Sequence, residues 1–268
     1  MDTARRPAFS IILPTHCRPH LLERALASVR QQQADEEIEV IVVSDAIDPA
    51  TDLTASRLLG ARDTYVRRSG RPGPSASRNL GLGLARGRHV LFLDDDDSLT
   101  PGFLGAALRE PAVQAGQAVY VDAVAVTESR LPSGPQVHGE SALALRDGLN
   151  EQVFVKNQVP FSCFLFPREA LHGMAFDEHM RAYEDWEFVL AFLQRQWPRH
   201  LALTGPRIHV VHDETTDRRG SSAAAQDHRA VMDYLYVYHR YPVADAALQQ
   251  RRWEMMQLFS IPLPPQVY

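Results

Sequence analysis

The sequence is short of cysteine and of long apolar runs, and each shortage excludes a class of protein. Cys17 and Cys163 are the only cysteines in 268 residues, too few for a disulfide framework or for the ligand spacing of a zinc site. We therefore expect a reducing, cytoplasmic location. The apolar runs fall far below the roughly 20 residues that span a bilayer. Residues 1–16 lack the apolar core of a signal peptide.

The sequence also lacks an excess of basic residues. Lys and Arg total 28 against 33 Asp and Glu, which gives a net charge of -5. No basic stripe with interleaved aromatic residues is present, so we exclude nucleic acid as a partner. Lysine is nearly absent, since Lys156 is the only one. The 45% apolar composition suffices for one large domain, or for one domain with an appended lobe.

The first hundred residues alternate between short apolar runs and helical patterns. The runs predict strands at 9–13, 38–43, 64–68 and 89–93, and the helical spacing predicts helices at 21–33, 49–59 and 75–85. This alternation is typical of an α/β protein with a parallel, doubly wound sheet and right-handed crossovers. Thr100 and Pro101 are expected to begin the next helix, as N-cap and first helical residue.

The pattern changes after Pro101. We expect strands at 117–126, 161–166 and 207–212, a turn-rich segment at 131–139, and helices at 184–196, 224–240 and 244–259.

Four consecutive aspartates, Asp94 to Asp97, follow the predicted strand at 89–93. In open parallel sheets the ligand crevice lies at the carboxyl ends of the strands. Neighbouring carboxylates repel and raise one another's pKa unless a cation lies among them. Carboxylate oxygens suit magnesium or manganese. The cluster therefore predicts a site for Mn²⁺ or Mg²⁺, and a solvated acidic turn is the alternative.

Four stretches, in order, resemble the family 2 glycosyltransferases of the GT-A fold: SIILPTHCRPHLLERALASVRQQ, IEVIVVSDA, ASRNLGLGLARGRHVLFLDDDDSLTPGFL and FDEHMRAYEDWEF. The resemblance runs from Phe9 to His212. It implies a Rossmann-like, mostly parallel sheet with helices on both faces, plus C-terminal helices. It also implies an inverting, metal-dependent enzyme that moves a sugar from a nucleoside-diphosphate donor, with UDP expected, to an acceptor hydroxyl.

The resemblance implies roles for donor-site residues. Asp45 would recognise the base, because a carboxylate accepts the imide N–H of uracil. Pro14 and Thr15 would contact the base or ribose. Arg78 would clamp the diphosphate through paired donors.

The aspartates resemble the family's D-x-D element. By that match Asp96 binds the metal, while Asp94 or Asp95 contacts the ribose or sugar. His212 is expected as a further metal ligand, with His209 as the alternative; an ordinary structural histidine is the other interpretation of both.

Glu184-Asp185 resembles the family's acidic pair at a helix start. Asp185 would be the general base that takes a proton from the acceptor hydroxyl, with inversion at the anomeric carbon. Arg218 and Arg219 would fold over the diphosphate and exclude water; a plain solvated loop is the alternative.

Two other functions fit parts of the sequence. VLFLDDDDS also resembles the strand-end motif of haloacid-dehalogenase-type phosphatases, with Asp94 as the nucleophile. That motif normally ends the first strand, whereas here it ends about the fourth, and Lys156 is the only lysine available. The second alternative is a catalytically inactive nucleotide-sugar-binding module, against which the retained metal aspartates and candidate base argue.

The resemblance also implies a domain organisation. We expect a catalytic domain at 1–222, with a donor half at 1–101 and an acceptor half at 102–222, and a helical extension at 223–268. The acceptor would be a carbohydrate, a lipid-linked molecule or a small molecule. Arg251 and Trp253 beside an apolar stripe suit an anionic membrane, at its inner face. Docking on the catalytic domain or in a homodimer is the alternative for this stripe.

Overall fold

The structure is a computed structural model that describes residues 6–32, 37–131, 134–211 and 228–259. Within these residues, strands form one sheet in the order β3-β2-β1-β4-β8-β6-β9-β5, and β7 pairs with β6. The strands are β1 (Phe9–Thr15), β2 (Ile38–Ser44), β3 (Thr64–Arg67), β4 (His89–Phe92), β5 (Ser98–Leu99), β6 (Val119–Leu131), β7 (Gly134–Leu143), β8 (Phe164–Pro167) and β9 (Arg199–Val211).

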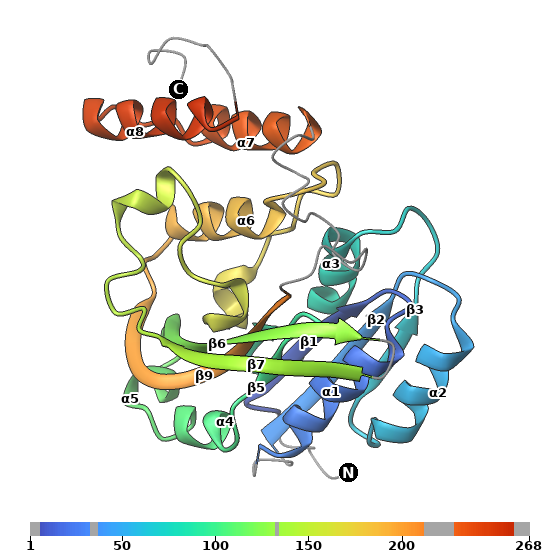
Figure 1. Cartoon of the computed structure of the whole chain (residues 1–268). Helices are drawn as coiled ribbons and strands as arrows, with labels where there is room; N and C mark the ends of the chain where they lie inside the picture. Colours follow the sequence, from blue (N-terminus) through green and yellow to red (C-terminus); the bar gives the residue numbers. More distant parts are fainter. Residues whose placement is uncertain (1–5, 33–36, 132–133, 212–227, 260–268) are drawn as a thin grey trace.

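The first half of the chain builds the expected doubly wound sheet. β1 pairs in parallel with β2 and β4, and β2 with β3. Helices α1 (Pro19–Arg30) and α2 (Pro49–Leu58) cover one face, and α3 (Pro74–Leu84) covers the other (Figure 1). α3 lies so close to β1 that only glycine fits at position 81: a Cβ there would stand 2.4 Å from Cγ2 of Ile12. β1 and β2 are buried along their whole length, as strands covered on both faces should be.

The second half extends this sheet with mixed pairing. β8 runs antiparallel to β4 and β6, while β9 runs parallel to β6 and antiparallel to β5. Short helices α4 (Phe103–Ala107) and α5 (Pro111–Gln114) follow β5, and 3₁₀ turns occupy Glu151–Phe154, Phe161–Cys163 and Arg168–Leu171. Helix α6 (Glu184–Leu193) packs aromatic residues onto β4 and β8. Phe188, for example, stacks 4.1 Å from Phe176 and contacts Phe92 edge-on at 5.8 Å.

Four sequence predictions about this half are wrong. One is the strand at 207–212, because β9 already begins at Arg199. No helix begins at Thr100, whose hydroxyl donates instead to the Thr204 carbonyl (2.6 Å); α4 begins after Gly102, which has a positive φ of 74°. The segment 131–139 is mostly strand, because β6 runs on to Leu131 and β7 pairs with it. Its glycines and prolines suggested turns, but β7 is an exposed edge strand, where proline is tolerated. The strand at 161–166 begins only at 164, after a 3₁₀ turn.

Helices α7 (His228–Arg240) and α8 (Ala246–Gln257) form a layer over α6 (Figure 1). The predicted apolar stripe of α8 docks on the rest of the chain, since Leu248, Arg252 and Met256 are buried. Arg252 donates to the carbonyls of residues 154, 238 and 241. None of the described helices is long and apolar enough to cross a membrane.

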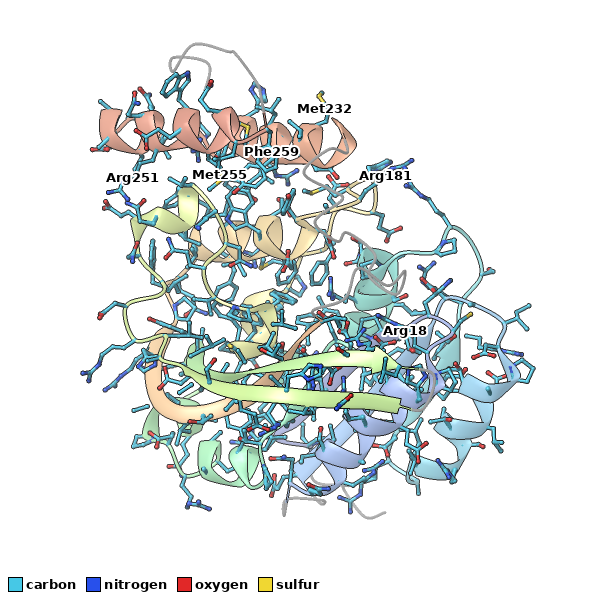
Figure 2. The ribbon with its side chains drawn as sticks, in the orientation of Figure 1. Arg18, Arg181, Met232, Arg251, Met255 and Phe259 are labelled. Atoms are coloured by element: carbon cyan, nitrogen blue, oxygen red, sulfur yellow. The ribbon has the colours of Figure 1, made fainter. Side chains whose placement is uncertain are left out.

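A smaller cavity of about 320 Å³ lies beside α8. Lys156, Met255 and Leu258 help to line it, as does Arg251, which donates to the Gln152 side chain (2.7 Å). Met255 and Arg251 lie on the side of α8 that faces the protein body (Figure 2).

Candidate active site

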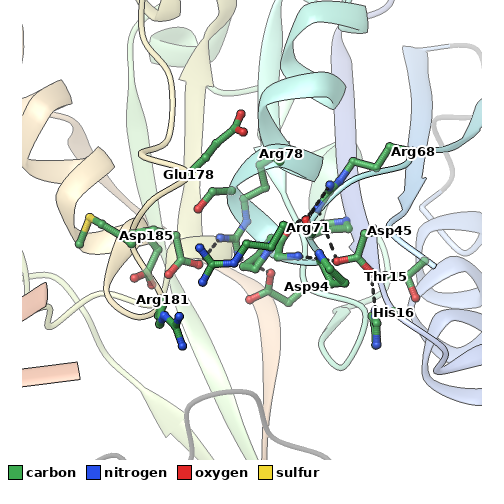
Figure 3. A pocket seen from close by; sticks show the side chains of 18 of the residues that line it. Thr15, His16, Asp45, Arg68, Arg71, Arg78, Asp94, Glu178, Arg181 and Asp185 are labelled. Atoms are coloured by element: carbon green, nitrogen blue, oxygen red, sulfur yellow. Dashed lines mark hydrogen bonds and ion pairs between the residues drawn. The ribbon is translucent and has the colours of Figure 1, made fainter. Parts of the chain in front are cut away.

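A cavity of about 1020 Å³ opens at the carboxyl ends of β1, β2 and β4. The strand order reverses between β1 and β4, which is where ligands bind in open α/β sheets. Asp185 and Arg181 stand at one end of this cavity, Asp45 and His16 at the other, and Asp94 lies between them (Figure 3). Apart from His209, the alternative metal ligand, the predicted site residues that the structure describes line it: Pro14, Thr15, Asp45, Arg78, Asp94, Asp95, Asp96 and Asp185. His212, Arg218 and Arg219 lie outside the described residues.

The four aspartates divide into two pairs. The side chains of Asp94 and Asp96 are 41% and 24% exposed, whereas Asp95 and Asp97 are buried. Burial raises the pKa of Asp95 to about 7 and raises the pKa of Asp97 well above its usual range. The carboxylates of Asp94 and Asp96 are therefore accessible from the cavity. Those of Asp95 and Asp97 form hydrogen bonds with neighbouring groups inside the protein.

The cations beside these carboxylates are arginines of the chain itself. Arg18 pairs with Asp95 and lies 3.4 Å from Oδ2 of Asp96. Arg130, from β6, lies 3.3 Å from the same oxygen. Thr15 donates its hydroxyl to Asp95 (2.7 Å). The sequence predicted a cation among the aspartates. Part of that positive charge comes from Arg18 and Arg130, which the sequence analysis did not identify.

His209 has a structural position. Its Nδ1 lies 2.8 Å from the Glu128 carboxylate and its Nε2 lies 3.0 Å from the Ser98 hydroxyl. Its backbone N–H donates to Asp97 (3.0 Å). Because both ring nitrogens are engaged and the residue is buried, the interpretation as an ordinary structural histidine fits best.

Asp94 and Asp96 carry carboxylate oxygens suited to a divalent ion, and both side chains are partly exposed in the cavity. No cluster of three or more His, Cys, Asp or Glu ligands exists within the described ranges. Mg²⁺ is commonly held by one or two carboxylates together with substrate phosphates rather than by an all-protein cage. Two carboxylates that line a large open cavity fit that mode.

Arg78 connects the two sides of the cavity. It is only 4% exposed, and its guanidinium donates to Asp94 and to Glu184, both at 2.7 Å. It also lies over the rings of Phe161 and Phe176, at 5.5 and 5.4 Å. The guanidinium thus ties α3, the aspartate turn and the start of α6 together. Its predicted contact with a diphosphate stays a prediction.

Asp185 sits in the first turn of α6. The residue before the helix, Tyr183, is the N-cap and has a left-handed backbone with φ of 61°. One Asp185 oxygen accepts the N–H of Trp186 (2.7 Å). Burial, followed by the negative charge of Glu184, raises the pKa of Asp185 to about 6. A carboxylate with this pKa is ionised at neutral pH and is well matched to accept a proton there.

Asp45 is held by three groups at the far end of the cavity. One oxygen lies 2.5 Å from Nδ1 of His16. The other accepts the N–H of Gly73 (2.7 Å) and lies 3.6 Å from Arg68. Sequence reasoning missed His16 and Arg68, although each lies just beyond the last residue of a strand, and that position was the available signal.

Residues 10–173 match the family model described as Glycosyl transferase family 2, which is more than half of the chain. The chain belongs to glycosyl transferase family 2. Family membership makes it a glycosyltransferase and overturns the phosphatase alternative with Asp94 as nucleophile.

Two curated relatives of this family 2 protein illustrate its similarities. A GalNAc(5)-diNAcBac-PP-undecaprenol beta-1,3-glucosyltransferase of Campylobacter jejuni is 28% identical over 235 residues, covering 85% of this chain and 72% of the relative. The succinoglycan biosynthesis protein ExoO of Rhizobium meliloti is 28% identical over 197 residues, covering 70% of this chain and 56% of the relative. The chain therefore spans little more than half the length of the second relative.

Solved structures agree on the fold. TarS residues 1–349 of S. aureus in complex with UDP-GlcNAc superimposes with a TM-score of 0.60 at 18% identity, covering 94% of this chain and 73% of TarS. The mannosyltransferase PcManGT of Pyrobaculum calidifontis, in complex with GDP-Man and Mn²⁺, gives a TM-score of 0.57 at 19% identity, covering 96% and 71%. These likenesses confirm the predicted GT-A fold.

Proposed function

We propose that the protein is an inverting, metal-dependent glycosyltransferase that moves a sugar from a UDP-linked donor to an acceptor hydroxyl. The observation that carries the proposal is the cavity in which Asp185, with its raised pKa, shares the space with the partly exposed carboxylates of Asp94 and Asp96. Such a cavity has room for a donor, an acceptor hydroxyl and a proton acceptor together.

The donor would lie along the carboxyl ends of β1, β2 and β4. Its base would reach the end formed by Asp45 and His16. Asp94 and Asp96 would hold Mn²⁺ or Mg²⁺, which neutralises charge on the departing diphosphate when bound. Arg71 and Arg181 line the cavity, and neither side chain has a hydrogen-bond or ion-pair partner among the described residues. These two guanidiniums are therefore available for the anionic oxygens of the donor.

The acceptor would enter at the Asp185 end. The ionised carboxylate takes the proton of the attacking hydroxyl as the bond to the anomeric carbon forms. A single base on the face opposite the leaving diphosphate gives inversion. The name of the Campylobacter relative specifies a lipid-linked acceptor, and we propose the same acceptor class here.

Thermal unfolding against nucleotides tests this function. UDP, dTDP, GDP and CDP are compared with and without Mn²⁺, for the wild type and for Asp96→Asn. A nucleotide at about 100 times its dissociation constant adds roughly 2.7 kcal/mol, which is a shift of several degrees for a domain of this size. We expect a UDP shift that requires Mn²⁺ and is lost in Asp96→Asn. A chain that no nucleotide stabilises would contradict the proposal.

A further inference from the structure

Helix α7 holds the loop that leads into Asp185. Oδ2 of Asp233, on α7, accepts the backbone N–H groups of Arg181 (2.8 Å) and Ala182 (3.1 Å). Figure 2 shows Arg181 on this loop, beneath α7. Two adjacent N–H groups that donate to one carboxylate oxygen form a stronger contact than a single bond between neutral groups.

The segment that these bonds hold is strained. Tyr183 has a left-handed backbone (φ 61°), which costs a residue with a Cβ free energy and persists only where its surroundings enforce it. Its ring packs edge-on against Tyr234 of α7, with centroids 4.8 Å apart. Asp185 follows two residues later. Asp233 and Tyr234 of α7 both contact this turn. The direction of the Asp185 carboxylate therefore depends on contacts with α7.

Further contacts attach α7 and the residue after it to α6 and to the start of the loop. Just beyond the end of α7, the Tyr241 hydroxyl donates to Glu187 (2.7 Å). Arg240, the last residue of α7, lies 3.0 Å from the same carboxylate. Glu187 is buried in α6 itself. At the start of the loop, Tyr236 of α7 donates its hydroxyl to Asp177 (2.9 Å). Side chains of α7 and Tyr241 thus hold the chain on both sides of the loop, at Asp177 before it and at Glu187 after it.

We propose that Asp233 is a positioning residue for the transfer reaction. It fixes the turn at residues 181–183, and through that turn it sets the aim of the Asp185 carboxylate at the acceptor hydroxyl. The proposal rests on the proposed role of Asp185 as general base. A displacement of about 1 Å at a reacting group costs up to 100-fold in rate, so a tether remote from the chemistry is enough to change kcat.

Three variants separate positioning from general stability. Asp233→Ala removes both acceptor contacts, whereas Asp233→Asn keeps an amide oxygen that can accept the same two N–H groups. Asp245→Ala is the matched control: it removes an aspartate that caps α8 by accepting the Leu248 N–H (2.9 Å), in the same helical layer but away from the loop. UDP-glucose, UDP-GlcNAc and GDP-mannose serve as probes, and nucleotide release to water is measured together with the affinity for the free nucleotide.

We expect Asp233→Ala to lower kcat for nucleotide release about tenfold while the nucleotide affinity stays within about twofold of wild type. Asp233→Asn should recover most of the lost rate, and Asp245→Ala should leave it unchanged. Hydrogen exchange gives a readout that does not depend on activity: in Asp233→Ala, the amides of Arg181 and Ala182 should exchange faster than in Asp245→Ala.

Other results overturn the proposal in distinguishable ways. If Asp233→Ala releases nucleotide at the wild-type rate, Asp233 positions nothing that matters for catalysis. If Asp245→Ala slows the reaction equally, the effect is general destabilisation. If the wild type releases nucleotide from no probe and binds none, the proposed function fails and the catalytic role of Asp233 fails with it. Unchanged exchange in Asp233→Ala would show that the tether itself is absent.

Discussion

The two ends of the cavity, which we propose as its donor side and its acceptor side, are built by different means. On the donor side, Thr15, Asp45 and the aspartate turn stand where parallel strands end, so the backbone pairing of β1, β2 and β4 alone brings them together. On the acceptor side, Asp185 follows a strained turn that is held by a helix more than 40 residues later in the chain.

This difference shows which side is sensitive to change. Strand ends are fixed by many ladder hydrogen bonds and by buried strands on both sides, so one surface mutation moves them little. The acceptor loop depends on a few side-chain contacts, and one substitution removes a large share of them. Acceptor geometry is therefore easier to alter than donor geometry, which suits a fold that serves many acceptors.

Asp185→Asn gives the largest expected effect and sharpens the contrast. The amide cannot take a proton, so nucleotide release should fall by about 10²- to 10⁴-fold, whereas affinity for the nucleotide should barely change. Steady-state kinetics and calorimetric titration measure the two quantities. A variant that keeps near wild-type kcat would show that another residue is the base, and one that loses nucleotide affinity would break the separation of the two sides.

Arg78→Met should damage both sides at once. The change leaves Asp94 and Glu184 without their shared cation, and breaking the buried Arg78–Glu184 pair costs roughly 3–5 kcal/mol. Urea unfolding measures this loss. Arg67→Met is the control, because Arg67 forms a half-exposed pair with Asp52 (3.1 Å) and should cost less than about 1 kcal/mol. Equal losses in the two variants would mean that Arg78 does not connect the halves.

The pH dependence of kcat gives the smallest effect. Because the pKa of Asp185 is raised to about 6, the ionised base is depleted as the pH falls below that value, and kcat should drop about tenfold for each further pH unit. Rates between pH 5 and 8 test this. A flat profile down to pH 5 would contradict the raised pKa.

The same raised pKa affects stability with a definite sign. The folded-state pKa exceeds the ordinary value of 3.8, so the stability associated with the protonated carboxyl is complete below that value and is lost as the pH rises through about 6. Asp185→Asn should therefore unfold at a higher temperature than wild type at pH 8 and at a similar temperature at pH 4.

Most of the donor side could be predicted from the sequence, because strand ends are readable from apolar runs. Asp45 and Asp94 follow such runs directly, and the structure brings them into one cavity. The arginines that neutralise the aspartates could not be predicted. Arg130 comes from a β6 that runs well past its predicted end, and its approach to Asp96 depends on long-range pairing with β7 and β9.

On the acceptor side, the resemblance located Asp185 but not what holds it. Nothing local to Tyr183 signals a left-handed turn, since tyrosine is not a residue that favours positive φ. The tether Asp233 reads in sequence as one more polar residue of an amphipathic helix. The division at residue 222 and the contact with a membrane stay predictions.

The solitary lysine has a practical consequence. Lys156 is exposed beside α8, at the small cavity between the helical layer and the body of the protein. The chain has no other side-chain amine. An amine-reactive dye applied to the unmodified protein therefore labels Lys156, at this small cavity, and the N-terminal amine. The fluorescence of the dye on Lys156 during turnover would show whether α7 and α8 stay packed against the rest of the protein while sugar is transferred.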